Sequence, residues 1–204
     1  MKLFNQPKYP SHLQEELSIG KQALIFAWEI FKVVVISLAI IIPVRYYLIK
    51  PFYVKGASME PNFYDHEYLI IDELSYHLGD PQRGDIVVFK YPLDTTQYFI
   101  KRVIGLPGEI VQISEGRVTI INQQYPNGQD LFEAYLPQAT KTLGDFEVTL
   151  AENEYYLLGD NRLASLDSRA FGPVERRYII GKTLFRGWPL DRLGLVTNSL
   201  EYNL

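Results

Sequence analysis

Ser58 lies in a run of small residues, Gly56-Ala57-Ser58, that could expose a nucleophilic hydroxyl. An activated serine can form a covalent acyl intermediate, although the same residues also make an ordinary turn. The chain has no cysteine, and its histidines, His12, His66 and His77, lack the spacing of metal ligands. Hydrolytic chemistry here would therefore run without zinc, and a base other than histidine has to be considered.

Lys101 is the candidate for that base. In a strand from Gln97 to Leu106, alternation places Phe99, Lys101 and Val103 on one face. If that face is the core, burial disfavours the charged ammonium and lowers the lysine pKa, and a neutral amine near pH 7 can accept a proton. The alternative is a lysine on an edge or a solvent-facing surface. The alternation alone does not decide which face is inward.

A polar segment from Gly159 to Gly172 could position such a base. Asp167 and Arg169 could form a bidentate ion pair that stiffens the segment. Ser165 or Ser168 could hydrogen-bond an amine and orient it, which is the role of the third group in a catalytic triad. The alternative is a polar connection held by Asx turns.

The candidate nucleophile follows a long apolar stretch. Residues 30–49 are mostly apolar, interrupted by Lys32, Pro43 and Arg45. At 1.5 Å per residue, 20 residues extend about 30 Å, the thickness of a hydrocarbon core. A transmembrane helix is therefore predicted, with a buried helix of a soluble domain as the alternative. A cleaved signal peptide is disfavoured, because bulky residues follow the apolar run instead of a small-x-small site.

Beyond residue 50 the sequence changes to short strand-like segments separated by turns, which predicts a mostly β body. The expected strands are Glu67–Ile71, Asp85–Tyr91, Gln97–Leu106, Glu109–Ile113, Arg117–Ile121, Phe146–Leu150, Glu154–Leu158 and Tyr178–Phe185. Residues 122–145 show weak periodicity and are expected to be an irregular excursion. The net charge of −4 gives no electrostatic footprint for nucleic acid.

Four motifs together resemble bacterial type I signal peptidases, the membrane-anchored serine endopeptidases of peptidase family S26 that use a Ser/Lys dyad. Their order and spacing agree over roughly Pro51 to Pro189. The motifs are Gly56-Ala57-Ser58-Met59-Glu60-Pro61, Arg83-Gly84-Asp85-Ile86-Val87-Val88-Phe89, Lys101-Arg102-Val103-Ile104-Gly105-Leu106-Pro107-Gly108 and the segment Gly159 to Gly172.

The resemblance implies a role for each matching residue. Ser58 matches the nucleophile, Lys101 the general base, and Ser165 the serine that hydrogen-bonds the lysine. The other implied site residues are supporting groups or belong to the oxyanion and substrate-binding segment. The supporting groups are Asp160 and the salt bridge of Asp167 with Arg169, and the oxyanion and substrate-binding residues are Gly56, Ala57 and Met59. No metal or cofactor is implied.

Four residues depart from the commonest family patterns. Gly56 stands where some members have a serine whose hydroxyl helps the oxyanion hole, so the hole would depend on the Ser58 backbone N–H. Asn62-Phe63 replaces the more usual Thr-Leu, and Glu109 replaces the frequent Asp. Neither of these two replacements is expected to touch the chemistry.

The implied fold is an antiparallel β catalytic core with a small inserted subdomain, preceded by one N-terminal transmembrane helix. The expected organisation is an N-terminal polar segment, 1–29; a transmembrane anchor, 30–49; a catalytic core, 50–108 and 154–190; an inserted subdomain, 109–153; and a C-terminal tail, 191–204. Basic residues slightly favour a cytoplasmic N-terminus, with the catalytic domain extracytoplasmic. The membrane is expected to be of plasma or thylakoid type.

The implied activity is removal of signal peptides from exported preproteins after a small-x-small, Ala-x-Ala-like site. Signal peptides and membrane lipid are the expected partners, the protein-export translocon is a candidate partner, and a monomer is expected. One alternative is a non-catalytic membrane-anchored β-domain for binding or assembly. A second, a LexA-like self-cleaving peptidase, is disfavoured because an apolar anchor stands where a DNA-binding helix-turn-helix would be.

Overall fold

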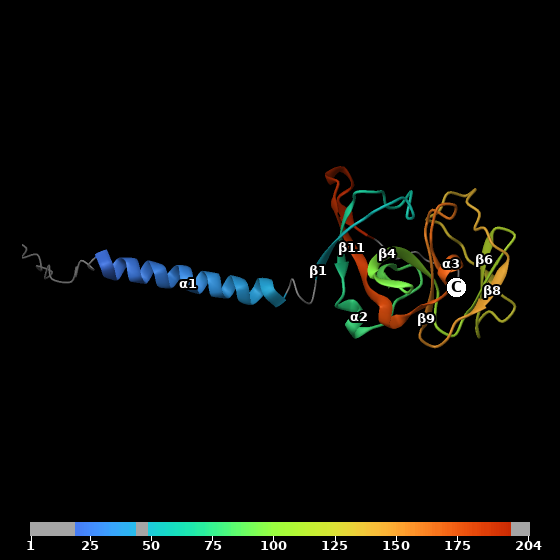
Figure 1. Ribbon diagram of the computed structural model, residues 1–204, viewed down its shortest axis with the longest axis horizontal. Coiled ribbons are helices and arrows are strands. Elements are labelled where there is room, and N and C mark those ends of the chain that lie inside the picture. Colours follow the sequence, from blue (N-terminus) through green and yellow to red (C-terminus); the bar gives the residue numbers. More distant parts are fainter. Residues whose placement is uncertain (1–18, 44–48, 197–204) are drawn as a thin grey trace, which may run out of the picture. The chain divides into compact units, whose positions relative to one another are not determined.

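The computed structural model describes residues 19–43 and 49–196 of the 204-residue chain. Contacts divide the chain into two compact units, Met1–Val44 and Arg45–Leu204. The first unit contains helix α1 (Ile19–Pro43), and the second contains the strands (Figure 1). All residues predicted to take part in catalysis belong to the second unit.

Helix α1 contains one candidate membrane span, Gly20–Ile42, with a mean hydropathy of 2.4. It begins earlier than the predicted anchor of residues 30–49, because residues 20–29 are rich in apolar and helix-favouring side chains. The helix therefore includes part of the predicted N-terminal polar segment, 1–29. Lys32 therefore lies well inside the helix, paired with Glu29 at 2.7 Å. Residues 44–48 lie outside the described residues, and Ile49 belongs to the first strand.

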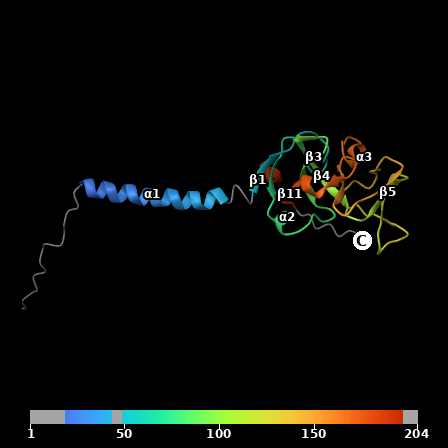
Figure 2. The same ribbon diagram turned by 60° about the horizontal axis from the view of Figure 1, so that its bottom comes forward.

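The second unit is built from two antiparallel sheets (Figures 1 and 2). The larger, 8-stranded sheet has the order β1-β2-β11-β3-β4-β9-β10, with β12 paired to β11, and the 4-stranded sheet has the order β7-β6-β5-β8. The strands are β1 (Ile49–Tyr53), β2 (Tyr68–Asp72), β3 (Ile86–Tyr91), β4 (Asp94–Gly105), β5 (Ile110–Ser114), β6 (Arg117–Ile121), β7 (Gln129–Asp130), β8 (Phe146–Thr149), β9 (Glu154–Leu158), β10 (Val174–Glu175), β11 (Ile179–Trp188) and β12 (Gly194–Leu195). The short helices are α2 (Ser75–Leu78), α3 (Ser168–Phe171), η2 (Arg176–Tyr178) and η3 (Leu190–Arg192).

The predicted mostly antiparallel β fold is confirmed, and each of the eight expected strands overlaps an observed one. Strand β1 was not expected, since Ile49 was assigned to the anchor. The predicted C-terminal tail, 191–204, also differs from the structure: Gly194 and Leu195 form β12 and pair with β11. Residues 197–204 lie outside the described residues.

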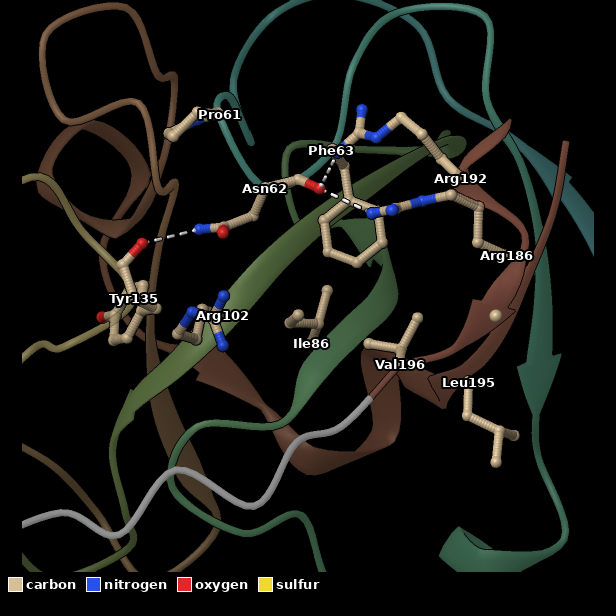
Figure 3. Close-up of a pocket in the computed structure, with 11 residues that line it drawn as sticks. Pro61, Asn62, Phe63, Ile86, Arg102, Tyr135, Arg186, Arg192, Leu195 and Val196 are labelled. Atoms are coloured by element: carbon tan, nitrogen blue, oxygen red, sulfur yellow. Dashed lines mark hydrogen bonds between the residues drawn. The ribbon is translucent and has the colours of Figure 1, made fainter. Parts of the chain in front are cut away.

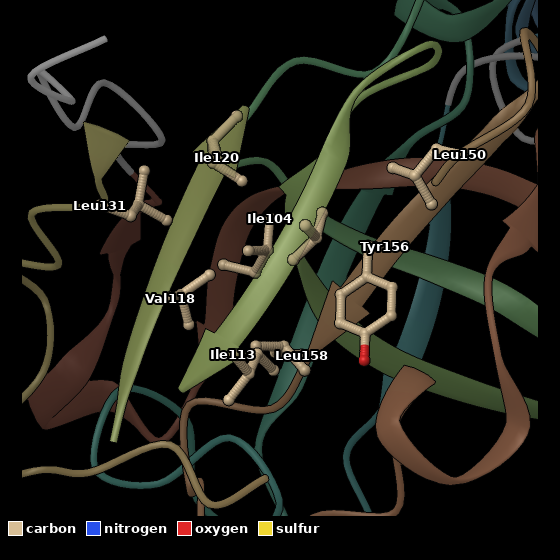
Figure 4. Close-up of a cluster of buried hydrophobic side chains, with 9 residues drawn as sticks. Ile104, Ile113, Val118, Ile120, Leu131, Leu150, Tyr156 and Leu158 are labelled. Carbon is tan, nitrogen blue, oxygen red and sulfur yellow. The ribbon is translucent and has the colours of Figure 1, made fainter. Parts of the chain in front are cut away.

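Apolar side chains from both sheets meet in one buried cluster (Figure 4). Ile104 of β4 and Leu158 of β9 come from the larger sheet, and Ile113 and Ile120 come from the smaller one. Burial of each such side chain contributes about 1.5–3 kcal/mol. The smaller sheet lies within the predicted insert of residues 109–153, so this cluster holds that segment against the strand that carries Lys101.

A second buried cluster lies under the loop that carries Ser58. Val54, Met59 and Phe63 of this loop pack against side chains of the larger sheet. Their partners there are Leu69, Ile71, Ile86, Val88 and Ile100. The loop is therefore fixed on the core by the residues that flank Ser58.

Candidate active site

Ser58 lies in the loop that joins β1 to β2. The Val54 N–H donates to the Glu67 carbonyl at 2.9 Å and closes the base of the loop. Farther along, the Gly56 N–H donates to the Asp65 carboxylate at 2.9 Å. Gly56 has a φ of +87°, which glycine adopts without strain, and the space beside its Cα is open. Glycine is thus needed here for backbone conformation rather than for room.

Lys101 projects from β4 toward Ser58. Its side chain is buried, with 3% exposed, and Nζ lies 2.8 Å from Ser58 Oγ and donates to the Ile100 carbonyl at 2.8 Å. Burial lowers the pKa of Lys101 from 10.5 to about 8, although the negative charges of Asp167 and Asp160 oppose the shift. With such a pKa, about a tenth of the lysines are neutral at pH 7.

Ser58 and Lys101 both line a cleft of about 360 Å³. The cleft lies between β1, which pairs only with β2, and the first part of β4, which pairs only with β3. In the part of the chain that the structure describes, both strands therefore present an unpaired backbone edge to the cleft. Its other lining residues are Phe52, Tyr53, Lys55, Tyr98, Phe99, Ile100 and Leu166.

Arg102 follows Lys101 on β4, and the two side chains lie on opposite faces of the strand. Arg102 is 2% exposed and forms a two-pronged ion pair with Asp160, with Nε–Oδ1 and Nη2–Oδ2 distances of 2.8 and 2.6 Å. Its guanidinium stacks 3.8 Å from the centre of the Tyr135 ring. Asn62 donates to Asp160 Oδ2 at 2.8 Å. Asp160 therefore supports the site through Arg102 and the segment after Ser58.

Asn161 connects the loop after β9 to the nucleophile loop. Its backbone N–H donates to the Ser58 carbonyl at 3.1 Å, and its side-chain amide donates to the Ala57 carbonyl at 3.1 Å. Arg162, also buried, donates to the Gly159 carbonyl at 3.0 Å and so stiffens the same loop. These bonds fix the backbone on either side of the Ser58 hydroxyl.

Asp167 and Arg169 form the bidentate pair that the sequence suggested, with Nε–Oδ1 and Nη2–Oδ2 distances of 2.8 Å each. Asp167 also accepts from the Gly159 N–H at 3.1 Å. Burial alone would raise the pKa of Asp167, but hydrogen bonds from Arg169 and Gly159, with a smaller effect of the nearby Ser165 hydroxyl, outweigh it and lower the pKa. The carboxylate stays charged within reach of Lys101.

Ser165 does not make the hydrogen bond to Lys101 that the resemblance implies. Its Oγ is buried and makes no hydrogen bond to a described residue, and the contacts of Lys101 Nζ are with Ser58 Oγ and the Ile100 carbonyl. Ser165 packs so close to Gly159 that a Cβ there would come within 2.1 Å of its Oγ. The other hydroxyl considered, Ser168, accepts from the Leu157 N–H at 3.0 Å and holds β9.

Met59 lies elsewhere than expected for a residue that faces substrate. The Phe63 N–H donates to the Met59 carbonyl at 2.8 Å, and the resulting turn directs the Met59 side chain into the core, where it is fully buried. The Met59 side chain is therefore not placed to contact substrate, in contrast to the expectation from the resemblance. Ala57 remains exposed, with its carbonyl held by Asn161.

The sequence reasoning missed the contributions of Arg102, Asn62, Asn161 and Arg162. Asn62 was set aside as a replacement without effect on the chemistry, but its amide connects Asp160 to the Tyr135 carbonyl. The sequence contains one indication for Arg102. Because it follows Lys101 on a strand, it must face the opposite side, and if that side is also buried, its charge requires a partner. The identity of that partner was not readable from local sequence.

An antiparallel β domain that holds a serine hydroxyl beside a buried lysine, in an open cleft, has the features of a serine hydrolase. Comparison with known proteins narrows the class. Residues 27–188 match the model of the family described as signal peptidase, peptidase S26. The chain belongs to this family, and it is accordingly a serine endopeptidase of the signal peptidase I class.

Relatives that match most of the chain are named signal peptidase I. It is 38% identical to a probable signal peptidase I-2 of Synechocystis over 85% of this chain and 78% of the relative. It is 36% identical to a signal peptidase I of Leptolyngbya laminosa over 93% of this chain and 87% of the relative. A solved signal peptidase I from Enterococcus faecalis is 34% identical, covers 51% of this chain and 97% of its own, and has a TM-score of 0.43.

Proposed function

We propose that the chain removes signal peptides by a Ser/Lys mechanism in which Ser58 is the nucleophile and Lys101 the general base. The observation that carries the proposal is the 2.8 Å separation of Ser58 Oγ and Lys101 Nζ inside an open cleft. This distance lies within the range for direct proton transfer. Burial of Lys101, which lowers its pKa to about 8, supports the role because the neutral amine is then populated near pH 7.

In the proposed reaction, neutral Lys101 Nζ takes the hydroxyl proton while Ser58 Oγ bonds to the scissile carbonyl carbon. The protonated amine then donates to the leaving nitrogen as the peptide bond breaks. Water then attacks the acyl carbon while its proton passes to Lys101, and the ammonium returns that proton to Ser58 Oγ as the ester bond breaks and the signal peptide leaves. Asp167 and Asp160 stabilise the ammonium that forms, since both charges act on Lys101.

The Ser58 backbone N–H is the proposed oxyanion donor in the nucleophile loop. It makes no hydrogen bond to a described residue and is therefore available, whereas the Gly56 N–H is engaged by Asp65. A donor of this kind contributes about 2.7–4 kcal/mol to transition-state stabilisation. The bonds from Asn161 to Ser58 and Ala57 hold it in place.

The proposed substrate is an extended preprotein segment with a small-x-small, Ala-x-Ala-like site. The unpaired edges of β1 and β4 support strand addition, which would set the register of the scissile bond. Bulky residues such as Phe52, Tyr53 and Phe99 form the walls of the cleft. Such walls favour small substrate side chains on either side of the nucleophile.

The proposed location is a plasma or thylakoid-type membrane, with the N-terminus cytoplasmic, the catalytic domain extracytoplasmic and α1 as the single span. An anchor of this kind would confine the enzyme to two dimensions beside membrane-bound preproteins. We propose a monomer in contact with lipid, and the protein-export translocon as a candidate neighbour.

The test mixes the detergent-solubilised full chain with a preprotein that carries an Ala-x-Ala site and measures the mature product. Ser58→Ala and Lys101→Ala are each expected to lower kcat/KM by about 10²–10⁴-fold or more, the usual contribution of a general base. Lys90→Ala is a matched control, because Lys90 is an exposed lysine on the neighbouring strand β3. Cleavage that persists in both active-site variants would show another catalytic mechanism, and no cleavage by the wild-type chain would indicate a non-catalytic domain.

A further inference from the structure

A second pocket, which shares no lining residue with the cleft of Ser58 and Lys101, is lined by arginines (Figure 3). Its volume is about 370 Å³. Arg186 and Arg192 approach the Asn62 carbonyl from one side, and Phe63, Ile86 and Val196 supply apolar walls. A pocket of this size is within the range of sites for small organic molecules.

The arginines of this pocket carry more positive charge than the nearby carboxylates balance. Arg186 Nε lies 2.8 Å from Glu67 Oε2 and Arg192 Nη1 lies 2.5 Å from Glu67 Oε1, so two guanidiniums share one buried carboxylate. The third arginine of the lining, Arg102, is already paired with Asp160. Among the described residues, the pocket therefore has one positive charge in excess.

The pKa of Arg186 responds to this surplus. Burial lowers the pKa, Glu67 raises it, and the charge of Arg192 lowers it again, with a lowered pKa as the result. An added negative charge between the two guanidiniums would relieve both unfavourable effects.

The two guanidiniums also hold unused donors in fixed positions. Each donates Nη2 to the Asn62 carbonyl, at 2.6 Å from Arg186 and 3.1 Å from Arg192. Among the described residues, none accepts from Arg186 Nη1 or Arg192 Nε. Stacking fixes the planes, with Arg186 4.7 Å from the Phe63 ring centre and Arg192 4.4 Å from that of Tyr64.

We propose that this pocket binds a phosphate group of single negative charge between Arg186 and Arg192. A phosphate has several oxygens, so it can accept hydrogen bonds from both guanidiniums at once. One negative charge neutralises the excess. The apolar wall accommodates an organic substituent on the phosphate, as in a phosphodiester. The phosphate comes from a phospholipid headgroup or from a soluble phosphate.

The test measures binding to the full chain in a neutral detergent by titration calorimetry. The probes are glycerophosphoglycerol, which is the headgroup of phosphatidylglycerol, and inorganic phosphate, each against chloride at equal ionic strength. We expect saturable binding of at least one phosphate probe. Tighter binding of the diester identifies a lipid-type ligand, and tighter binding of inorganic phosphate identifies a soluble one.

Variants assign the binding to these residues. Arg192→Gln should raise the Kd tenfold or more, while Arg177→Gln, at an exposed arginine paired with Glu175, should leave it unchanged. Glu67→Gln should lower the Kd several-fold, because the excess charge rises by one. Loss of folding would weaken binding in both variants, so a Kd that rises for Arg192→Gln and falls for Glu67→Gln distinguishes lost binding from lost folding. Binding no stronger than that of chloride, or equal weakening by Arg192→Gln and Arg177→Gln, would overturn the proposal.

Discussion

The two faces of β4 each bury a positive charge, but only one of them supplies that charge with a bidentate carboxylate partner. Lys101 and Arg102 are consecutive and almost equally buried. Arg102 forms a bidentate ion pair with Asp160. Asp167 is the carboxylate with the largest electrostatic effect on Lys101, but its own bidentate partner is Arg169. Removal of a buried cation that has its own partner leaves a buried charge unpaired, whereas a buried cation whose neighbouring carboxylate is already engaged has a shifted pKa that suits a catalytic role.

Removal of the paired cation should have the largest effect on stability. Arg102→Met leaves Asp160 buried without its main partner, and we expect a loss of about 3–5 kcal/mol of unfolding free energy. Chemical denaturation measures this loss. Arg117→Met is the control, because its partners Glu115 and Asp130 are exposed and such pairs contribute about 0–1 kcal/mol. A loss at Arg102 no larger than at Arg117 would remove the contrast between the two faces.

Removal of the unpaired cation should have the opposite sign. Lys101→Met is expected to stabilise the protein by about 1–3 kcal/mol at pH 7, because burial of the charged amine is costly. The folded state releases the proton near pH 8 and the unfolded state near 10.4. Between these values the unfolded state binds more protons, so wild-type stability rises with pH.

The gain from Lys101→Met is therefore complete below pH 8 and should shrink toward zero near pH 10.5. Denaturation curves at pH 7, 9 and 10.5 test this. Lys90→Met, at an exposed lysine of β3, should change stability by less than about 0.5 kcal/mol at each pH. A variant at Lys101 that destabilises at pH 7 would show that its hydrogen bonds outweigh its desolvation.

The same lysine should set the pH dependence of activity. Below a pKa of about 8 the neutral fraction of Lys101 falls tenfold per pH unit, so kcat/KM should rise about tenfold from pH 6 to pH 7 and level off above pH 8. Cleavage rates at low substrate concentration measure this, with melting curves to verify folding at each pH. A flat profile between pH 6 and 8 would argue against a lysine base.

The smallest expected effect concerns the residue that connects the Arg102 face to the nucleophile loop. Asn62→Ala removes two hydrogen bonds, to Asp160 and to the Tyr135 carbonyl, and should cost about 1 kcal/mol with a few-fold loss of activity. Asn153→Ala is the control, because Asn153 is exposed and its bond to the described residues is through its backbone carbonyl, which accepts from the Arg176 N–H. Equal behaviour of the two variants would mean that Asn62 does not position the loop.

Local pattern predicted those features that depend on near neighbours. Alternation and turn residues located eight strands. Alternation also indicated that Lys101 could face the core, and its side chain is indeed buried. The helix limits were less accurate, because residues 20–29 are apolar enough to extend the span. Strand β1 was not predicted, because its first residue, Ile49, continues the apolar run of the anchor and Pro51 interrupts the strand pattern.

Features that depend on distant contacts were not predictable. Arg102 and Asp160 are 58 residues apart, and nothing local pairs them. The resemblance placed Met59 among the substrate-binding residues, but the direction of its side chain depends on the turn that closes onto Phe63 and on a core that includes residues of β2, β3 and β4. Ser165 has the expected hydroxyl, but whether Lys101 Nζ bonds to it or to the Ile100 carbonyl depends on small differences in side-chain position, which the sequence does not determine.

The bonds from Asn161 to the nucleophile loop have a consequence for how the enzyme matures. The two residues joined by its side chain, Ala57 and Asn161, are 104 positions apart, so this bond can form only after the whole intervening chain has been made. A growing chain would thus have its anchor made long before the loop after β9 is synthesised. The peptidase would become active only on completion of its domain, which protects neighbouring nascent proteins from an unfinished protease.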